Sequence, residues 1–107
     1  MSEFSISPLE TGDGIKIVGE LDLATAQRLD VALRNAASQP ELVLDLSEVT
    51  FLDSYGVRSI LELCRARNGN RPLVIRNPSR AVCRVFDILA LDKHPGLELH
   101  VASEPLA

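Results

Sequence analysis

Apolar residues along this chain alternate between strand spacing and helical spacing. Short apolar or alternating runs predict five strands, at Phe4–Ser7, Ile15–Gly19, Leu42–Leu46, Leu73–Ile75 and Leu97–Val101. The turn residues Thr11–Gly14 separate the first two runs and predict an opening hairpin. The third run is apolar on both sides of Asp45, which predicts a central strand buried on both faces.

Three segments between these strands repeat apolar residues every three or four positions, and each predicts a helix. The first follows Asp22, a candidate N-cap, and reaches about residue 37, while the second covers about 54–68. For the third helix we expect Asn77 as the cap and Pro78 at the first position, where a missing N–H costs nothing. The inward stripe of this third helix is expected to consist of Val82, Val85, Phe86 and Leu89.

The order of these elements indicates an α/β fold, because strands and helices alternate after the opening hairpin. Strands joined through a helix usually lie parallel, whereas hairpin strands are antiparallel. We therefore expect a mixed central sheet of about five strands covered by about three to four helices. A length of 107 residues with 46% apolar residues suits a single domain, here residues 1–107, of which 102–107 are expected to be loose.

The charge of the chain limits its partners. A formal net charge of −4 opposes unspecific binding to nucleic acid or to an anionic membrane, and the basic residues are not interleaved with aromatic ones. The first residues lack the pattern of a secretory signal, and no apolar run approaches the span of a bilayer. We expect a cytoplasmic protein with no direct nucleic-acid contact and no membrane insertion.

The residues that usually carry chemistry form no recognisable catalytic or metal-binding set. Cys64 and Cys83 are far apart and lie on apolar helical stripes, which favours reduced core residues, and His94 and His100 have no ligands at metal spacing. Glycine-rich phosphate loops and hydrolase motifs are absent, and Ser54 has no candidate base. We expect no enzyme activity, no cofactor and no metal.

The segment Ser47–Ser54, expected to be a loop, joins the central strand to the second helix. Such loops lie at the carboxyl end of a sheet, where α/β folds commonly hold functional groups. Asp53 and Ser54 are also preferred N-cap residues, so a purely structural role stays open. Asp45 is expected to hydrogen-bond the loop that follows it.

The same region carries a resemblance to a known family. Leu44–Val57, with the sequence LDLSEVTFLDSYGV, resembles the signature of STAS-domain anti-sigma factor antagonists. Gly19–Ala26 is similar to the first strand-to-helix segment of that family, and Asn77–Ser79 with the apolar positions after it is similar to the third helix. The resemblance extends over nearly the whole chain and implies a STAS-type domain.

The resemblance implies a partner-switching cycle centred on Ser54. The unmodified protein is expected to bind an anti-sigma factor serine kinase of the GHKL type, which frees a sigma factor. Phosphorylation of Ser54 by this kinase then ends the binding, and a PP2C-type phosphatase restores the active form. A phosphate on Ser54 would face unpaired N–H groups of the helix, so we expect the fold to tolerate it. The expected partner-binding residues are Asp22, Asp53, Ser54, Tyr55 and Gly56.

Some questions stay open at the level of sequence. Tyr55 replaces the small residue usual in the family, and it is either an aromatic anchor for a partner or a cover over Ser54. Gly56 allows either close packing on the sheet or close approach of a partner backbone. Related domains also serve as scaffolds of stress-signalling assemblies or as small subunits of lipid-transport ATPases, and composition does not separate these non-switching functions from an antagonist.

Overall fold

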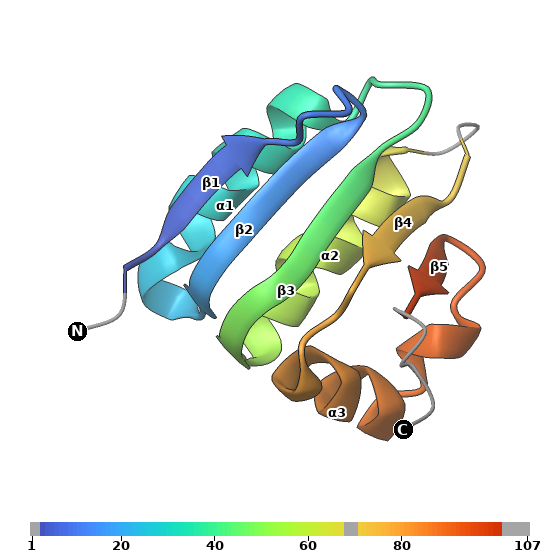
Figure 1. The fold of residues 1–107 in the computed structure, drawn as a ribbon. Helices are drawn as coiled ribbons and strands as arrows, with labels where there is room; N and C mark the ends of the chain where they lie inside the picture. Colours follow the sequence, from blue (N-terminus) through green and yellow to red (C-terminus); the bar gives the residue numbers. More distant parts are fainter. Residues whose placement is uncertain (1–2, 68–70, 102–107) are drawn as a thin grey trace, which may run out of the picture.

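A computed structural model describes residues 3–67 and 71–101 of the chain. These residues form a five-stranded sheet in which the strands lie side by side in sequence order (Figure 1). The strands are β1 (Ser5–Pro8), β2 (Gly14–Leu21), β3 (Val43–Leu52), β4 (Leu73–Arg76) and β5 (Leu97–His100). β1 pairs antiparallel with β2, and the other neighbouring pairs are parallel.

Three α-helices and one short 3₁₀ helix connect the strands within the described residues. They are α1 (Leu23–Ala36), α2 (Ser54–Ala66), α3 (Arg80–Ile88) and η1 (Leu91–Lys93). In Figure 1, α1 and α2 lie side by side behind the sheet, and all three α-helices begin at its lower edge. The mixed five-stranded sheet with its helices confirms the predicted α/β fold class.

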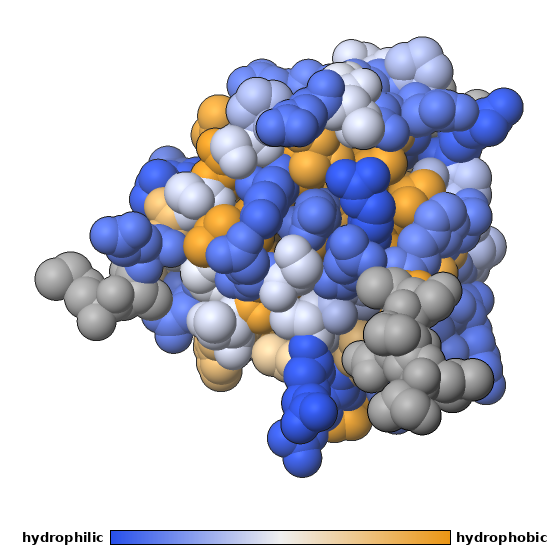
Figure 2. All heavy atoms as spheres, in the orientation of Figure 1, coloured by the Kyte–Doolittle hydropathy of each residue, from blue (hydrophilic) through white to orange (hydrophobic). Residues whose placement is uncertain are grey.

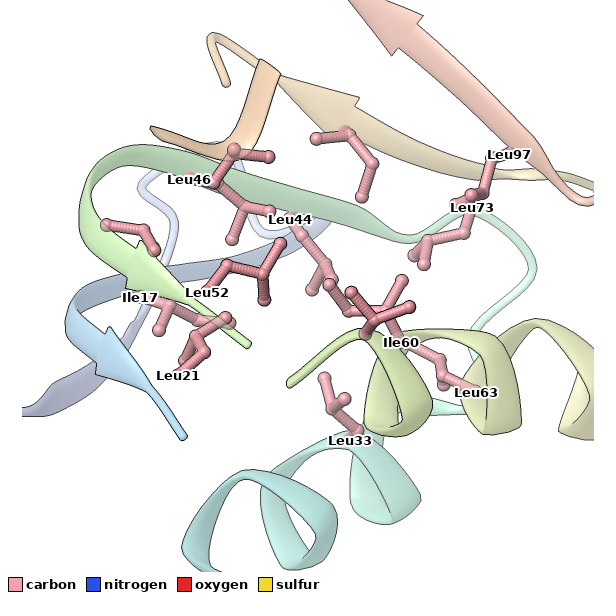
Figure 3. Packing of buried hydrophobic residues seen from close by; sticks show 14 of the residues in the cluster. Ile17, Leu21, Leu33, Leu44, Leu46, Leu52, Ile60, Leu63, Leu73 and Leu97 are labelled. Atoms are coloured by element: carbon pink, nitrogen blue, oxygen red, sulfur yellow. The ribbon is translucent and has the colours of Figure 1, made fainter. Parts of the chain in front are cut away.

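The core lies between the sheet and the helices. Leucines of β3 point toward residues of α2 and α1, as Figure 3 shows for Leu44, Ile60 and Leu33. Phe86 of α3 belongs to the same cluster, and each of these four side chains is at most 3% exposed. Val43 and Asp45 on the opposite face of β3 are also buried, so the central strand is buried on both faces as predicted.

The face of the sheet away from α1 and α2 is mainly polar. Strand register aligns Lys16, Asp45, Arg76 and His100 in one row across four neighbouring strands. Lys16 also forms a hydrogen-bonded ion pair with Glu48. The hydrogen bond and then the charge of the glutamate raise the pKa of Lys16. Figure 2 shows this face, where hydrophilic residues predominate and apolar residues form separate patches.

The expectation of a loop at Ser47–Ser54 is wrong, because β3 continues to Leu52. Two irregularities in the pairing of β2 with β3 each insert one extra residue into β3, and this breaks the alternation by which strands are predicted. As a result Leu46, Val49 and Leu52 all face the core at intervals of three residues. Asp45 accepts hydrogen bonds from the N–H and hydroxyl of Ser47, as expected, but Ser47 lies within the strand.

The predicted cap of α3 is also corrected. Asn77 and Pro78 precede the helix, and Ser79 is its N-cap, accepting a hydrogen bond from the N–H of Val82. Ser79 donates its own N–H to the carbonyl of Leu46 and its hydroxyl to that of Val49. Both carbonyls belong to the irregular part of β3, so the long-range contacts of Ser79 decide where α3 begins.

The inward stripe of α3 is shorter than predicted. Val82 and Phe86 are buried and Val85 is half-buried, whereas Leu89 is 51% exposed because the helix ends at Ile88. Val101 lies just beyond β5 and is exposed. The predicted end of the second helix at residue 68 and the predicted loose segment 102–107 lie outside the described residues.

Arg67, which directly follows α2, is a structural residue that the sequence pattern does not reveal. Its side chain is 3% exposed. The guanidinium donates hydrogen bonds to carbonyls of the α1–β3 connection, at Ala37, Gln39 and Pro40, and to the carbonyl of Arg71. Burial lowers its pKa. Arg67 therefore ties the end of α2 to the connection that leads into β3.

Candidate functional site

The candidate site lies where β2 and β3 end beside each other. Leu21 and Leu52 are partners in the parallel register, and the N–H of Asp53 donates to the carbonyl of Leu21 at 3.1 Å. Asp22 and Asp53 directly follow these partners, so the structure brings the two carboxylates to neighbouring positions at one sheet edge. Helices α1 and α2 begin at this edge as well (Figure 1).

Asp22 caps α1, as predicted, through a reciprocal arrangement with Thr25. The Asp22 carboxylate accepts from the N–H of Thr25 at 3.2 Å, and the N–H of Asp22 donates to the Thr25 hydroxyl at 3.1 Å. The same hydroxyl donates to the carbonyl of Glu20 at 2.7 Å. These bonds hold the start of α1 against the end of β2, and they fix the backbone position of Asp22.

Asp53 caps α2 and occupies the N–H groups of its first turn. One carboxylate oxygen accepts from the N–H of Tyr55 at 2.9 Å and from that of Gly56 at 3.2 Å. The expectation that a phosphate on Ser54 would face unpaired N–H groups is therefore wrong for these two amides. Because a helix start with its cap in place already carries a negative charge, it offers a second anion little stabilisation.

Ser54 is the first residue of α2, and its side chain is exposed. It lines a groove of about 450 Å³ together with Arg58 and Leu89, among other residues. Tyr55, which is 44% exposed, lines a separate groove with Ala26 of α1. Tyr55 therefore does not enclose Ser54, and of its two alternatives the geometry favours an accessible aromatic contact.

Gly56 lies where α2 packs closely against the ends of β2 and β3. A Cβ atom at this position would come within 2.5 Å of Leu52 Cδ1, 2.7 Å of the Leu21 carbonyl oxygen and 2.8 Å of Leu21 Cβ. Because Leu21 and Leu52 are core residues, they have no room to retreat. Of the two alternatives for Gly56, close packing on the sheet accounts for the glycine.

Three exposed residues near this edge were not singled out from the sequence. Leu23 begins α1 and is 65% exposed, and Phe51, near the end of β3, is 46% exposed. Like Tyr55, both are large apolar side chains exposed to solvent. The third is Arg58, one turn after Ser54. A leucine at the first position of a helix, outside its inward stripe, is the signal that could have identified Leu23.

The chemistry of the described residues is limited. No group of three or more His, Cys, Asp or Glu side chains within 3–67 and 71–101 is arranged to hold a metal ion. Cys64 and Cys83 are free and half-buried, and burial raises the pKa of the Cys64 thiol to about 11. None of the helices described is long and apolar enough to cross a membrane.

Comparison with known families identifies the domain. The family model described as "Mlab, STAS domain" matches residues 9–100. The chain belongs to the STAS domain family. This STAS assignment agrees with the resemblance of the segment that contains Ser54.

Solved structures with the same fold include anti-sigma factor antagonists. A candidate anti-sigma factor antagonist from Thermotoga maritima matches with a TM-score of 0.73 and 18% identity, over 92% of this chain and 86% of the other. The anti-sigma factor antagonist SpoIIAA in its unphosphorylated form matches with a TM-score of 0.67 and 25% identity, over 95% and 90%. The Bacillus cell fate determinant SpoIIAA in its phosphorylated form matches with a TM-score of 0.62 and 24% identity, over 95% and 93%.

Proposed function

We propose that this STAS domain is an anti-sigma factor antagonist that is switched by phosphorylation of Ser54. The observation that carries the proposal is the exposed hydroxyl of Ser54 at the first position of α2, directly after Asp53 and at the same sheet edge as Asp22. The similarity to SpoIIAA, a protein solved in unphosphorylated and phosphorylated forms, supports it.

In the proposed cycle, the unphosphorylated surface binds an anti-sigma factor serine kinase of the GHKL type. Asp22 and Asp53 supply negative charge for a basic partner, and exposed Tyr55 supplies apolar contact area. The kinase transfers the γ-phosphoryl group of ATP to the Ser54 oxygen, which loses its proton, and ADP leaves. A PP2C-type phosphatase later hydrolyses the ester with water and restores the serine. Gly56 contributes by letting α2 sit close to β2.

The proposed effect of the phosphate is local. It adds about 1.5 to 2 negative charges beside Asp53, whose carboxylate already occupies the nearby N–H groups. An interface formed around the serine hydroxyl has no positive group matched to this dianion, so burying it there beside Asp22 and Asp53 costs roughly 2–5 kcal/mol of binding, which corresponds to about a 30- to 5,000-fold loss of affinity. We expect the backbones of the free and phosphorylated proteins to superimpose closely, and a disordered start of α2 after phosphorylation would contradict this.

The proposal also covers the domain organisation of the protein, its location and the way it acts. We infer that residues 1–107 act as one domain, which the match over 9–100 and the shared core cluster support. The protein would work in the cytoplasm through binding alone, without catalysis, without a cofactor and without contacting nucleic acid.

Incubation with GHKL-type kinases and ATP tests the antagonist function. We expect wild-type protein to bind one kinase in calorimetry and to gain one phosphate by mass, after which binding is lost. Ser54→Ala should bind without gaining phosphate. Ser47→Ala is the matched control, because Ser47 is also exposed but lies within β3, and it should behave as wild type. If the wild-type protein neither binds nor accepts phosphate from any kinase, the proposal fails.

A non-switching interaction module, such as a stress-signalling scaffold or the small subunit of a lipid-transport ATPase, is the second candidate. It is favoured by the matching family model, which is described as a Mlab STAS domain rather than as an antagonist. Copurification with an ATPase and permease would support it, provided that replacing Ser54 by Ala or by phosphoserine leaves the association unchanged. An association that phosphoserine abolishes would exclude the non-switching function.

A further inference from the structure

The groove that runs along α2, which Leu89 at the end of α3 also lines, places an arginine within reach of the proposed switch. Ser54 and Arg58 line it together, and they are one helical turn apart on α2. We propose that a phosphate on Ser54 is bound by Arg58, which leaves its present partner Glu62 to do so. This inference rests on the proposed function, since it specifies what the phosphate contacts within the protein.

The helix start is a poor receptor for the phosphate. Asp53 accepts from the N–H groups of Tyr55 and Gly56, so a phosphate would have to displace a carboxylate from the two amides it needs most. The displaced carboxylate would remain beside the phosphate, because the two residues are adjacent. Repulsion between the two anions directs the phosphate away from the cap and along the groove.

Arg58 has the spacing and the freedom to receive it. Residues at i and i+4 of a helix have Cβ atoms about 5–6 Å apart, a distance that a phosphoserine and an arginine side chain easily bridge. The Arg58 side chain is 73% exposed, and its ion pair with Glu62 joins Nε to one carboxylate oxygen at 3.0 Å. An exposed pair of this kind contributes little, whereas a phosphate dianion accepts two guanidinium hydrogen bonds at once.

The movement of Arg58 from Glu62 to the phosphate would also change the surface around Tyr55. Arg58 and Glu62 line both the groove that contains Ser54 and the groove between α1 and α2 that contains Tyr55. When Arg58 turns toward the phosphate, the Glu62 carboxylate loses its counter-charge. Phosphorylation then makes the surface beside Tyr55 more negative, so one modification alters two adjacent parts of the proposed partner surface.

Phosphoserine incorporated at position 54 during translation provides a direct test, because it requires no kinase. The titration of the phosphate is followed by ³¹P NMR in the full chain. The neighbouring charges are Asp53, Glu62, Arg58 and Arg65. If Arg58 binds the dianion, Arg58→Ala should raise the midpoint of the phosphate titration by roughly 0.5 pH unit.

Three further variants separate the proposed contact from a general effect of charge. Arg65→Ala is the matched control, because Arg65 lines the same groove but lies about 10 Å further along the helix than Arg58, and it should change the midpoint much less. Arg58→Lys should raise the midpoint less than Arg58→Ala does, because lysine keeps the positive charge. Glu62→Gln should lower the midpoint because it frees Arg58.

An unchanged midpoint in Arg58→Ala, or an equal change in Arg65→Ala, would overturn the inference. Circular dichroism checks that the exposed substitutions leave the fold intact. If no kinase phosphorylates the protein while the Arg58 effect is present, the proposed function fails and the contact stands.

Discussion

Replacing Gly56 by alanine is the most direct test of how the site is built. The added Cβ would lie 2.5–2.8 Å from atoms of Leu52 and Leu21, well inside van der Waals contact. One of these atoms is the Leu21 carbonyl oxygen, which accepts the N–H of Asp53, so relief requires α2 to move away from β2. The substitution therefore disturbs the packing on β2 of the start of α2, which contains Ser54.

The expected loss of stability in Gly56→Ala follows from two opposing effects. Overpacking a close-packed site costs about 1–3 kcal/mol, while alanine gains up to about 1 kcal/mol of helix propensity over glycine. We expect Gly56→Ala to lower the free energy of unfolding by about 1–2 kcal/mol. In urea unfolding the midpoint should fall by roughly 1 M, and the melting temperature should fall by about 4–8 °C per kcal/mol.

A double variant identifies the source of the loss. Leu52→Val removes the Cδ1 atom that lies nearest to the added Cβ, so Gly56→Ala should cost less in that background than in the wild type. The contact with Leu21 remains, and the rescue should be partial. If Gly56→Ala is as stable as the wild type, helix propensity outweighs packing and the explanation offered for Gly56 is refuted.

Three other predictions concern residues away from the switch. Arg67→Met should lower the unfolding free energy by roughly 2–4 kcal/mol in urea, because it removes the buried guanidinium that donates to the carbonyls of Gln39 and Pro40, and Arg67→Lys should recover part of this loss. Ala90→Gly should raise the melting temperature through a gain of about 0.5–1 kcal/mol, since Ala90 has a φ of +54°, while Asn77→Gly at +50° should gain less because asparagine tolerates this conformation. With a pKa of about 11 instead of 9.0, folded Cys64 in a Cys83→Ala background should react with iodoacetamide at pH 8 roughly 100-fold more slowly than in urea. The same pKa change should reduce stability as the pH rises from about 9 to about 11, because the unfolded thiol loses its proton first; equal alkylation rates would contradict the burial of this thiol.

The geometry of the cap changes the expected physics of the switch. From sequence, the start of α2 is a favourable place for a phosphate. In the structure, Asp53 fills that place, and the exposed Ser54 hydroxyl lies beside an occupied cap. We therefore propose that the phosphate is bound by Arg58 rather than stabilised by the helix dipole. The present partner of Arg58 is Glu62, and an exposed ion pair of this kind is easily displaced.

Local patterns determined the order of the elements and two of the helix starts. Asp22 and Asp53 are caps that act on amides two or three residues further along, and such short-range bonds are readable from sequence. The buried central strand was also predictable, because the run is apolar on both faces, with Leu44 and Leu46 on one and Val43 on the other. These features depend on neighbours along the chain.

Tertiary contacts decided the features that depend on distant residues. β3 extends to Leu52 because it pairs with β2 through two irregularities that no alternating pattern encodes. Ser79 rather than Asn77 caps α3 because carbonyls about 30 residues away bind it. The role of Gly56 follows from the approach of Leu21 to within 2.7 Å of a missing Cβ. A sequence specifies which residues are available, but only the packed chain brings such partners together and determines which alternative they stabilise.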